Sequence, residues 1–363
     1  MNIDQIINEY KNQFPLYDRY TQKNEQFLKE ILESININHI LEAHTKDPDH
    51  LREKILREDK SYKDPLHEIT DLSGLRIILR HLTDVNKVVK LIEEEFVIDK
   101  ENSIYIYDIP ANQFGYRSIH LVVCHKEERL KLIEWNDFKL LKAEIQIRTH
   151  LQHAWAEISH EFIYKVDTDI PKEVRRPLFR LSALFEIADE EVNRIVHDVN
   201  EVRRNYKKGI IKGENLLEIN VDSLKSYIEN SEEVQYWNEF ILNDSEIGHR
   251  VEGWGDLSRD VRIAEFCGLK TIEDIDHILK KAHGWGERFL KEYFKKYYFN
   301  DKYSLRMIST FINGSVTMLM IASYADKFEP KILVKEFGFS EPRYALKILD
   351  IAKAVQKDDI LNS

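Results

Sequence analysis

The stretch EIQIRTHLQHAWAEISHEFIYK, residues 144–165, holds a strand pattern that passes directly into a helix pattern. In its first six residues, Glu144, Gln146 and Arg148 alternate with apolar or small residues, so a pleated strand would place all three on one face. Burying a carboxylate, an amide and a guanidinium in a row costs desolvation free energy. A ligand that carries a metal ion and phosphates would compensate for that cost, so the strand is predicted to carry chemistry.

The residues after Thr149 repeat with the period of a helix that packs on a sheet. The apolar positions of this helix are Leu151, Ala154, Trp155, Ile158 and Phe162. The pattern therefore predicts that the strand carries the functional groups and that the helix supports it from one side.

Composition favours a helix-rich protein in a reducing compartment. The 363 residues suffice for about two domains, and 43% of them are hydrophobic, with only 12 Gly and 8 Pro. The two cysteines, Cys124 and Cys267, are far apart and lack the spacing of a zinc site. The N-terminus has no signal-peptide pattern, and the apolar run at 315–325 is shorter than the roughly 20 residues that span a bilayer. We expect a soluble, cytoplasmic protein with no membrane partner.

The formal net charge of -11 argues against non-specific nucleic-acid binding, which uses a basic field. The chain still has 53 Lys and Arg residues. A local positive pocket for a phosphate-bearing substrate is therefore compatible with the acidic balance.

The N-terminal region is predicted to be helical. Apolar residues recur at helical spacing over 4–37, and Pro15 is expected to divide them into two helices. A short helix follows, with Asp47 as its N-cap and Pro48 at its first position. Its polar side carries Lys46, Arg52, Lys54 and Arg57. Such a basic face is as often merely solvated as it is functional, so other motifs must decide.

Two further segments place polar groups in apolar strands. In EITDLSGLRIILRHL, residues 68–82, Asp71 precedes a Ser-Gly turn or bulge and a buried strand that also holds Arg76. In FGYRSIHLVV, residues 114–123, the side chains Tyr116, Ser118 and His120 share one face. Asp71 alone would be interpreted as a turn residue.

Asp71 and Glu144 would lie together if their strands are neighbours in one sheet. Two carboxylates are the usual protein share of a Mg²⁺ site that also binds substrate phosphates. The combination predicts nucleotide chemistry at this sheet.

The second half of the chain has a different character. A long helix is predicted to end near Tyr206, and KKGIIKG marks a linker, which we place at 206–213. Residues 214–363 show only helical patterns with aromatic clusters and no catalytic motif. We predict an α+β domain at 1–205 followed by an all-α C-terminal domain at 214–363.

Several of these segments resemble a known family. DLSGLR at 71–76, FGYRSIH at 114–120 and EIQIRT at 144–149, followed by AWAEISHEFIYK, are similar to the synthetase domain of the RelA/SpoT family, in particular to its small alarmone synthetases. The motifs occur in the family's order, and the resemblance covers roughly residues 1–205. It implies a mixed β-sheet flanked by helices, nucleotidyltransferase-like. It also implies a (p)ppGpp synthetase, or GTP pyrophosphokinase, that transfers the pyrophosphoryl group of ATP to the 3′-hydroxyl of GDP or GTP with Mg²⁺.

The resemblance implies roles for individual residues. Asp71 is similar to the family's magnesium aspartate, and Glu144 to the acidic residue that completes the metal site and helps to deprotonate the attacking hydroxyl. The implied ATP-binding residues are Lys46, Arg52, Lys54 and Arg76, of which the last stacks on adenine. The implied acceptor-binding residues are Tyr116, Ser118, His120, Gln146 and Arg148.

Two departures from the family pattern leave the acceptor open. His44 stands where many synthetases have an arginine of the adenine clamp, and residues 111–114 replace a loop that usually holds a lysine. A toxic branch of the family modifies the 3′ end of tRNA instead of a guanine nucleotide. The alternatives are therefore a tRNA pyrophosphokinase and, from another class, a catalytically silent nucleotide-sensing module.

The helical second half is expected to regulate the enzyme or to hold oligomers together. Its many aromatic residues must be covered in its own domain, by the first domain or in a homo-oligomer. A protein regulator that acts on this half is one further expectation, and a purely structural role is the alternative.

Overall fold

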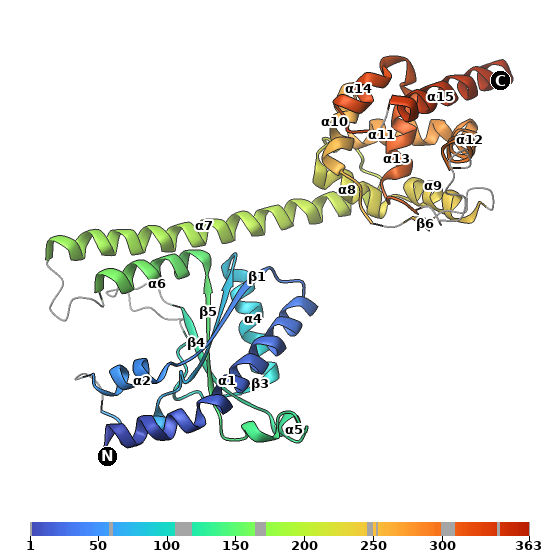
Figure 1. The fold of residues 1–363 in the computed structure, drawn as a ribbon. Helices are drawn as coiled ribbons and strands as arrows, with labels where there is room; N and C mark the ends of the chain where they lie inside the picture. Colours follow the sequence, from blue (N-terminus) through green and yellow to red (C-terminus); the bar gives the residue numbers. More distant parts are fainter. Residues whose placement is uncertain are drawn as a thin grey trace. The chain divides into compact units, whose positions relative to one another are not determined.

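The computed structural model describes residues 2–57, 61–105, 118–163, 172–244, 250–251, 253–298, 309–339 and 342–362. The chain forms two compact units, Met1–His197 and Asp198–Ser363 (Figure 1). Each unit has a hydrophobic core of its own. The long helix α7 (Lys172–Ile211) begins in the first unit and ends in the second.

In the described part of the first unit, five strands form one mixed sheet in the order β1-β2-β5-β4-β3 (Figure 1). Strands β2 and β5 run parallel, and the other neighbours run antiparallel. The strands are β1 (His39–Thr45), β2 (Ser73–Leu79), β3 (Phe96–Ile98), β4 (Ile119–His125) and β5 (Ala143–Thr149). The strands predicted at the two motif segments 68–82 and 144–149 are confirmed.

One face of the sheet belongs to the hydrophobic core. Leu75 and Ile77 of β2 and Ile145 of β5 are buried there, because successive side chains of a strand point to opposite faces. Two helices pack on this face, α1 (Ile3–Ser34) and α4 (Leu82–Glu95). Each such side chain contributes about 1.5–3 kcal/mol when it is fully buried, so this face anchors the strands and leaves the opposite face for polar groups.

Helix α1 is one helix of 32 residues, and the predicted break at Pro15 is wrong. Tyr10 before the proline and Tyr20 after it are both fully buried in the same core. Packing on both sides therefore outweighs the roughly 3 kcal/mol that an internal proline costs. Beyond α1, the short helix predicted at Pro48 is confirmed as α2 (Pro48–Ile55), and Asp47 caps it by accepting a 2.8 Å bond from the Asp49 amide.

Helix α6 (His150–Ile163) follows β5 directly, as the change of period predicts. Trp155 of α6 packs with Leu178 of α7 in a small separate cluster. Thr149 at the end of β5 donates a 2.5 Å hydrogen bond to Asp189 of α7. Burial raises the pKa of Asp189 to about 7. The remaining short elements of the unit are α3 (Pro65–Glu68), α5 (Glu127–Leu130) and η1 (Asn136–Phe138).

The second unit is helical, with one pair of two-residue strands among its described residues. Its elements are α8 (Val221–Asn230), α9 (Glu232–Asn243), β6 (Arg250–Val251), α10 (Leu257–Cys267), α11 (Ile272–Lys281), η2 (Ala282–Gly284), α12 (Gly286–Tyr298), β7 (Ser309–Thr310), α13 (Gly314–Ser323), η3 (Ala325–Lys327), α14 (Pro330–Lys335) and α15 (Pro342–Asn362). The apolar run at 315–325 supplies α13, whose Leu319 and Met320 are completely buried. Among the described helices, none has the length and apolar character that crossing a membrane requires.

Helix α7 extends beyond its predicted end near Tyr206. Residues 206–211 of the predicted linker 206–213 are helical, and a turn at Gly213 follows. Ile210 is buried in the core of the second unit. That burial offsets the roughly 1 kcal/mol by which Gly209 disfavours the helix.

Candidate active site

The face of the sheet opposite the core carries two rows of side chains that cross the strands. In the first row Glu42, Arg76, Gln146 and His120 stand directly opposite one another on β1, β2, β5 and β4. In the second row His44, Gly74 and Glu144 do the same on the first three strands. We call the residues of these two rows, together with Arg148, the polar face.

Hydrogen bonds fix the first row. Arg76 donates from Nη1 to Glu42 Oε2 at 2.8 Å and from Nε to Gln146 Oε1 at 3.5 Å. Arg148 donates to the same Gln146 oxygen. The Gln146 amide nitrogen donates to Glu144 Oε1 at 3.1 Å. The amide therefore links two guanidinium groups on one side to a carboxylate on the other.

Glu144 is the acceptor at the centre of the polar face. It contacts His120 Nδ1 at 3.0 Å and accepts from Thr70 Oγ1 at 3.4 Å. Burial alone would raise the pKa of its carboxyl, but hydrogen bonds from His120 and Gln146 outweigh burial and hold the pKa at about 2. Glu144 is therefore ionised at neutral pH. The other His120 nitrogen, Nε2, lies 2.8 Å from Ser118 Oγ, which fixes the ring between the two partners.

Asp71 stands between two lysines at the start of β2. Its Oδ2 lies 2.9 Å from Lys46 Nζ and 2.8 Å from Lys54 Nζ. The Tyr10 hydroxyl donates to the Lys46 carbonyl at 2.6 Å and so ties this segment to α1. The other carboxylate oxygen, Asp71 Oδ1, is buried and has no hydrogen-bond partner within the described part of the chain. An unpartnered carboxylate oxygen is suited to accept a cation.

The two carboxylates belong to one site. Thr70, the residue before Asp71, bonds to Glu144, and Lys54, a partner of Asp71, also helps to lower the pKa of Glu144. A hollow of about 490 Å³ adjoins Lys54 and Thr70. Among the described residues, no group of three or more His, Cys, Asp or Glu side chains is placed to hold a metal ion. Asp71 and Glu144 remain the two carboxylates for which the sequence predicts a role in a metal site.

Arg148 is a buried cation with a spare donor. Its exposed fraction is 4%, and its Nε has no hydrogen-bond partner among the residues described here. Burial lowers the pKa of its guanidinium to about 10, so the group remains charged at neutral pH. A desolvated guanidinium with a free donor binds phosphate or carboxylate oxygens strongly.

His44 fills the space above Gly74. A Cβ atom built on Gly74 would lie 2.5 Å from Cε1 and 2.6 Å from Nε2 of the His44 ring. Burial and the neighbouring Lys46 and Arg76 charges lower the pKa of His44. The Ser-Gly pair predicted as a turn or bulge thus begins a regular strand, in which the glycine makes room for an imidazole ring.

The structure brings most of the predicted site residues together, with two exceptions. The polar face and its surroundings hold Lys46, Lys54, Asp71, Arg76, Ser118, His120, Glu144, Gln146 and Arg148. Arg52 instead pairs with Asp4 at the start of α1, at 2.7 Å. Tyr116 lies outside the described residues.

Sequence reasoning missed Glu42 and treated His44 only as a departure from a family pattern. Both alternate with apolar residues in HILEAHT, residues 39–45, which is the same signal that identified β5. It also missed Thr70, for which the sequence offers no periodic signal.

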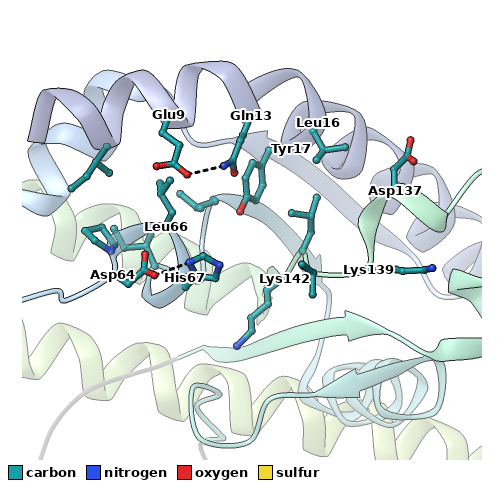
Figure 2. A pocket seen from close by; sticks show the side chains of 16 residues that line it. Glu9, Gln13, Leu16, Tyr17, Asp64, Leu66, His67, Asp137, Lys139 and Lys142 are labelled. Atoms are coloured by element: carbon teal, nitrogen blue, oxygen red, sulfur yellow. Dashed lines mark hydrogen bonds and ion pairs between the residues drawn. The ribbon is translucent and has the colours of Figure 1, made fainter. Parts of the chain in front are cut away.

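A separate cavity of about 470 Å³ lies between α1, α3 and residues 139–142. Figure 2 shows Tyr17 and Leu66 lining it, with Lys142 and His67 at its edge. Ile69 and Leu72 line it as well, whereas Thr70 between them bonds to Glu144 of the polar face and Asp71 pairs with Lys46. The cavity is thus behind the segment that carries Asp71 and is not part of the polar face.

Comparison with known proteins assigns the family. The region found in RelA/SpoT proteins matches residues 43–169. GTP pyrophosphokinase YjbM of Bacillus subtilis (strain 168) is 32% identical over 160 residues, which are 42% of this chain and 72% of that protein. The chain belongs to the RelA/SpoT family. The membership predicted from the motifs is therefore confirmed.

Other proteins are also similar to this RelA/SpoT chain. GTP pyrophosphokinase YwaC of the same organism is 33% identical over 143 residues, 39% of this chain and 63% of that protein. The crystal structure of small alarmone synthetase 1 from Bacillus subtilis is 26% identical, covers 53% of this chain and 99% of that one, and has a TM-score of 0.45. The RelA/SpoT match at 43–169 includes Asp71, Glu144 and their bonded partners.

Proposed function

We propose that this chain is a Mg²⁺-dependent pyrophosphokinase that transfers the pyrophosphoryl group of ATP to the 3′-hydroxyl of GDP or GTP. The observation that carries the proposal is the ionised Glu144 beside Asp71, within a ring of bonded lysine and arginine side chains. Membership in a family whose relatives include two GTP pyrophosphokinases supports it. We place the reaction in the cytoplasm, where ATP and guanine nucleotides are available.

Asp71 and Glu144 would hold the Mg²⁺ ion. The donor set fits, because both groups are hard carboxylates and Asp71 Oδ1 is a buried oxygen without a partner among the described residues. When bound, the ion supplies neutralisation of phosphate charge. A carboxylate with a pKa of about 2 keeps its charge at any physiological pH, so proton competition does not weaken the site.

The side chains of this chain position the two substrates. Lys46 and Lys54, which neutralise Asp71 in the structure, are placed to bind the phosphates of ATP. Arg76, held by Glu42 and Gln146, presents a planar cation to the adenine. On the acceptor side we place Ser118 and His120, which bond to each other, with Tyr116, Gln146 and Arg148. Phosphoryl-type transfer depends chiefly on such positioning and charge neutralisation.

The reaction forms one bond, breaks one bond and transfers one proton. The 3′ oxygen of the acceptor bonds to the β-phosphorus of ATP, and the bond from that phosphorus to the bridging oxygen of the α-phosphate breaks. AMP leaves with the electron pair. The proton of the hydroxyl passes through Glu144, whose position His120 fixes by the 3.0 Å contact, and on to water, because a carboxyl with a pKa of about 2 does not retain it.

Labelled ATP incubated with GDP, GTP or deacylated tRNA tests the reaction and the acceptor together. We expect label on GDP and GTP in the wild type, and a loss of at least about 100-fold in Asp71→Asn and in Glu144→Gln, since removal of one transition-state charge costs on the order of 3 kcal/mol. Asp137→Asn is the matched control, because Asp137 pairs with the surface residue Arg19 outside the polar face.

Two outcomes contradict the proposal. Wild-type turnover in either Asp71→Asn or Glu144→Gln would show that the substituted carboxylate is not needed for the reaction. Label on tRNA alone would identify the enzyme as a tRNA pyrophosphokinase. If no acceptor is labelled although ATP binds, the silent sensing module is correct.

We further propose that the helical half, predicted as 214–363 and compact from Asp198 onward, regulates the enzyme, with a homo-oligomer or a protein regulator as its partner. Its own buried core supports an independent role. A chain that ends after His197 tests this. Unchanged turnover in the folded fragment would contradict restraint by the helical half, and a change from oligomer to monomer would support an oligomerising role.

A further inference from the structure

The second unit contains a groove between the end of α7 and α8, which we call the α7–α8 groove. It has a volume of about 920 Å³. Its lining residues are Asn200, Arg203, Arg204, Lys207, Val221, Asp222, Lys225, Ser226, Glu229, Asn230, Trp254 and Leu257. The family match ends at residue 169, so nothing in that match assigns a role to these residues.

One face of α7 supplies the basic side of the groove. Asn200, Arg203, Arg204 and Lys207 recur at the spacing of a single helix face and are all exposed. Arg203 also reaches across the groove to Asp222 of α8, with Nε 2.7 Å from Oδ1. The α7 side of the groove is therefore basic, on a protein whose formal net charge is -11, whereas the α8 side also carries Asp222 and Glu229.

This arrangement of charges is unfavourable for the helix by itself. Arg203 and Lys207 are four residues apart, and so are Arg204 and Lys208. Like charges at this spacing destabilise a helix by about 0.2–0.5 kcal/mol per pair. Cations stabilise the last turn of a helix, but Arg203 and Arg204 precede the last turn of α7, which ends at Ile211. Arg203 already pairs with Asp222, so an anion bound in the groove would be attracted chiefly to Arg204 and Lys207.

The opposite wall of the groove adds an aromatic ring. Trp254 is half-buried just before α10, and the Lys225 ammonium group lies 5.4 Å from the centroid of its ring. The ring thus holds a cation over its face, and Leu257 lies beside it in the groove lining. A nucleobase can take the place of that ammonium group, and stacking on an aromatic side chain contributes about 1–3 kcal/mol per base.

We propose that the α7–α8 groove binds a nucleoside di- or triphosphate, with its base on Trp254 and its phosphates against Arg203, Arg204 and Lys207. The volume of about 920 Å³ agrees with the roughly 300–1,000 Å³ of small-ligand sites. The acidic groups Asp222 and Glu229 in the same lining, and the acidic chain as a whole, disfavour a long polyanion such as RNA.

Tryptophan fluorescence and calorimetry on the full chain, titrated with GDP, test the groove. We expect GDP to quench part of the fluorescence in the wild type, and this part to disappear in Trp254→Phe. Arg204→Glu and Lys207→Glu should each weaken the binding that causes the quench by at least about 10-fold, since each replaces a charge that attracts the phosphates by one that repels them. Lys208→Glu is the matched control, because Lys208 has the same helix and charge but lies outside the groove lining.

Four outcomes would overturn the proposal. The Trp254 quench could persist unchanged in Arg204→Glu and Lys207→Glu, or no Trp254-dependent quench could occur at all. A single-stranded oligoribonucleotide that binds more than about 10-fold more tightly than GDP would instead identify an RNA site. Inorganic pyrophosphate that binds as tightly as GDP would identify an anion site without base recognition.

The groove and the proposed reaction are tested separately. The KM values for ATP and GDP in Arg204→Glu report on the polar face, which this substitution leaves intact. Failure of the pyrophosphokinase appears as absence of label transfer, whereas failure of the groove appears only in the Trp254 signal.

Discussion

Replacement of Gly74 by alanine is expected to destabilise the first unit through one identified neighbour, His44. The new Cβ would lie 2.5 Å from Cε1 and 2.6 Å from Nε2 of the imidazole ring. Carbon atoms in van der Waals contact are about 3.5–4.0 Å apart. Gly74 has no positive φ, so the backbone itself accepts alanine, and the ring must move.

The expected magnitude follows from two opposing contributions. Overpacking of this kind typically costs about 1–3 kcal/mol. Alanine in place of glycine within a strand contributes about 0.5–1 kcal/mol of stability, because the unfolded chain loses freedom. In a His44→Ala background the clash is absent, and Gly74→Ala should then be neutral or stabilising. We therefore expect a coupling free energy of about 2 kcal/mol between the two positions.

The assay must report on the first unit by itself, because the chain has two compact units and need not unfold in one step. Amide hydrogen exchange of β1 and β2, followed by mass spectrometry at increasing urea, meets this requirement. The wild type, the two single variants and the double variant complete the cycle. A coupling below about 0.5 kcal/mol would refute the reasoning, since it would mean that the His44 ring does not occupy the space above Gly74.

Three further predictions concern the same unit. Lys54→Ala should lower kcat/KM for ATP by about 10–100-fold, because the Lys54 side chain lies at Asp71. Arg52→Ala should change it less than about 3-fold, because the Arg52 side chain pairs with Asp4 instead. Equal losses in kcat/KM would contradict the structure. Burial lowers the pKa of His125 to about 3, so between pH 6.5 and 3 the unfolded state binds a proton that the folded state does not. The free energy of unfolding, measured with urea, should therefore fall by up to about 1.4 kcal/mol per pH unit as the pH falls from 6.5 toward 3. The His125→Phe variant should lack this slope. Burial raises the pKa of Asp189 to about 7, so between pH 4 and 7 the folded state binds a proton that the unfolded state does not. The free energy of unfolding should therefore fall as the pH rises from about 4 to 7. The same pH dependence in Asp189→Asn would contradict this prediction.

Much of the candidate site was predictable from local sequence. Alternation of Glu144, Gln146 and Arg148 with apolar residues places them on one face of any strand they form. The same reasoning applied to residues 39–45 identifies Glu42 and His44, although the basic helix after them attracted attention first. Such a pattern depends only on neighbours along the chain, so it can be recognised without knowledge of the fold.

The pairing of distant segments was not predictable in this way. Parallel pairing places Glu144 opposite Gly74, and antiparallel pairing places Gln146 opposite His120. These registers follow from burial of Leu75 and Ile145 in one core, which no local pattern contains. The environment that holds the pKa of Glu144 at about 2 is a consequence of the registers, because its partners come from other strands and turns.

The two basic residues of α2 show most directly that the sequence alone does not predict the partners of charged side chains. Arg52 and Lys54 are two positions apart on one short helix, and the family resemblance implies an ATP-binding role for both. In the folded chain Lys54 bonds to Asp71, whereas Arg52 bonds to Asp4.

Pro15 is a second example, because its helix-breaking tendency is a local property that burial of Tyr10 and Tyr20 overrides. The sequence by itself determined the strands β2 and β5, the helices α2 and α6, and the residue types of the site, since these depend on dihedral preference and periodicity. Only the tertiary structure decided which charges meet, since that depends on the packing free energy of residues far apart in the chain.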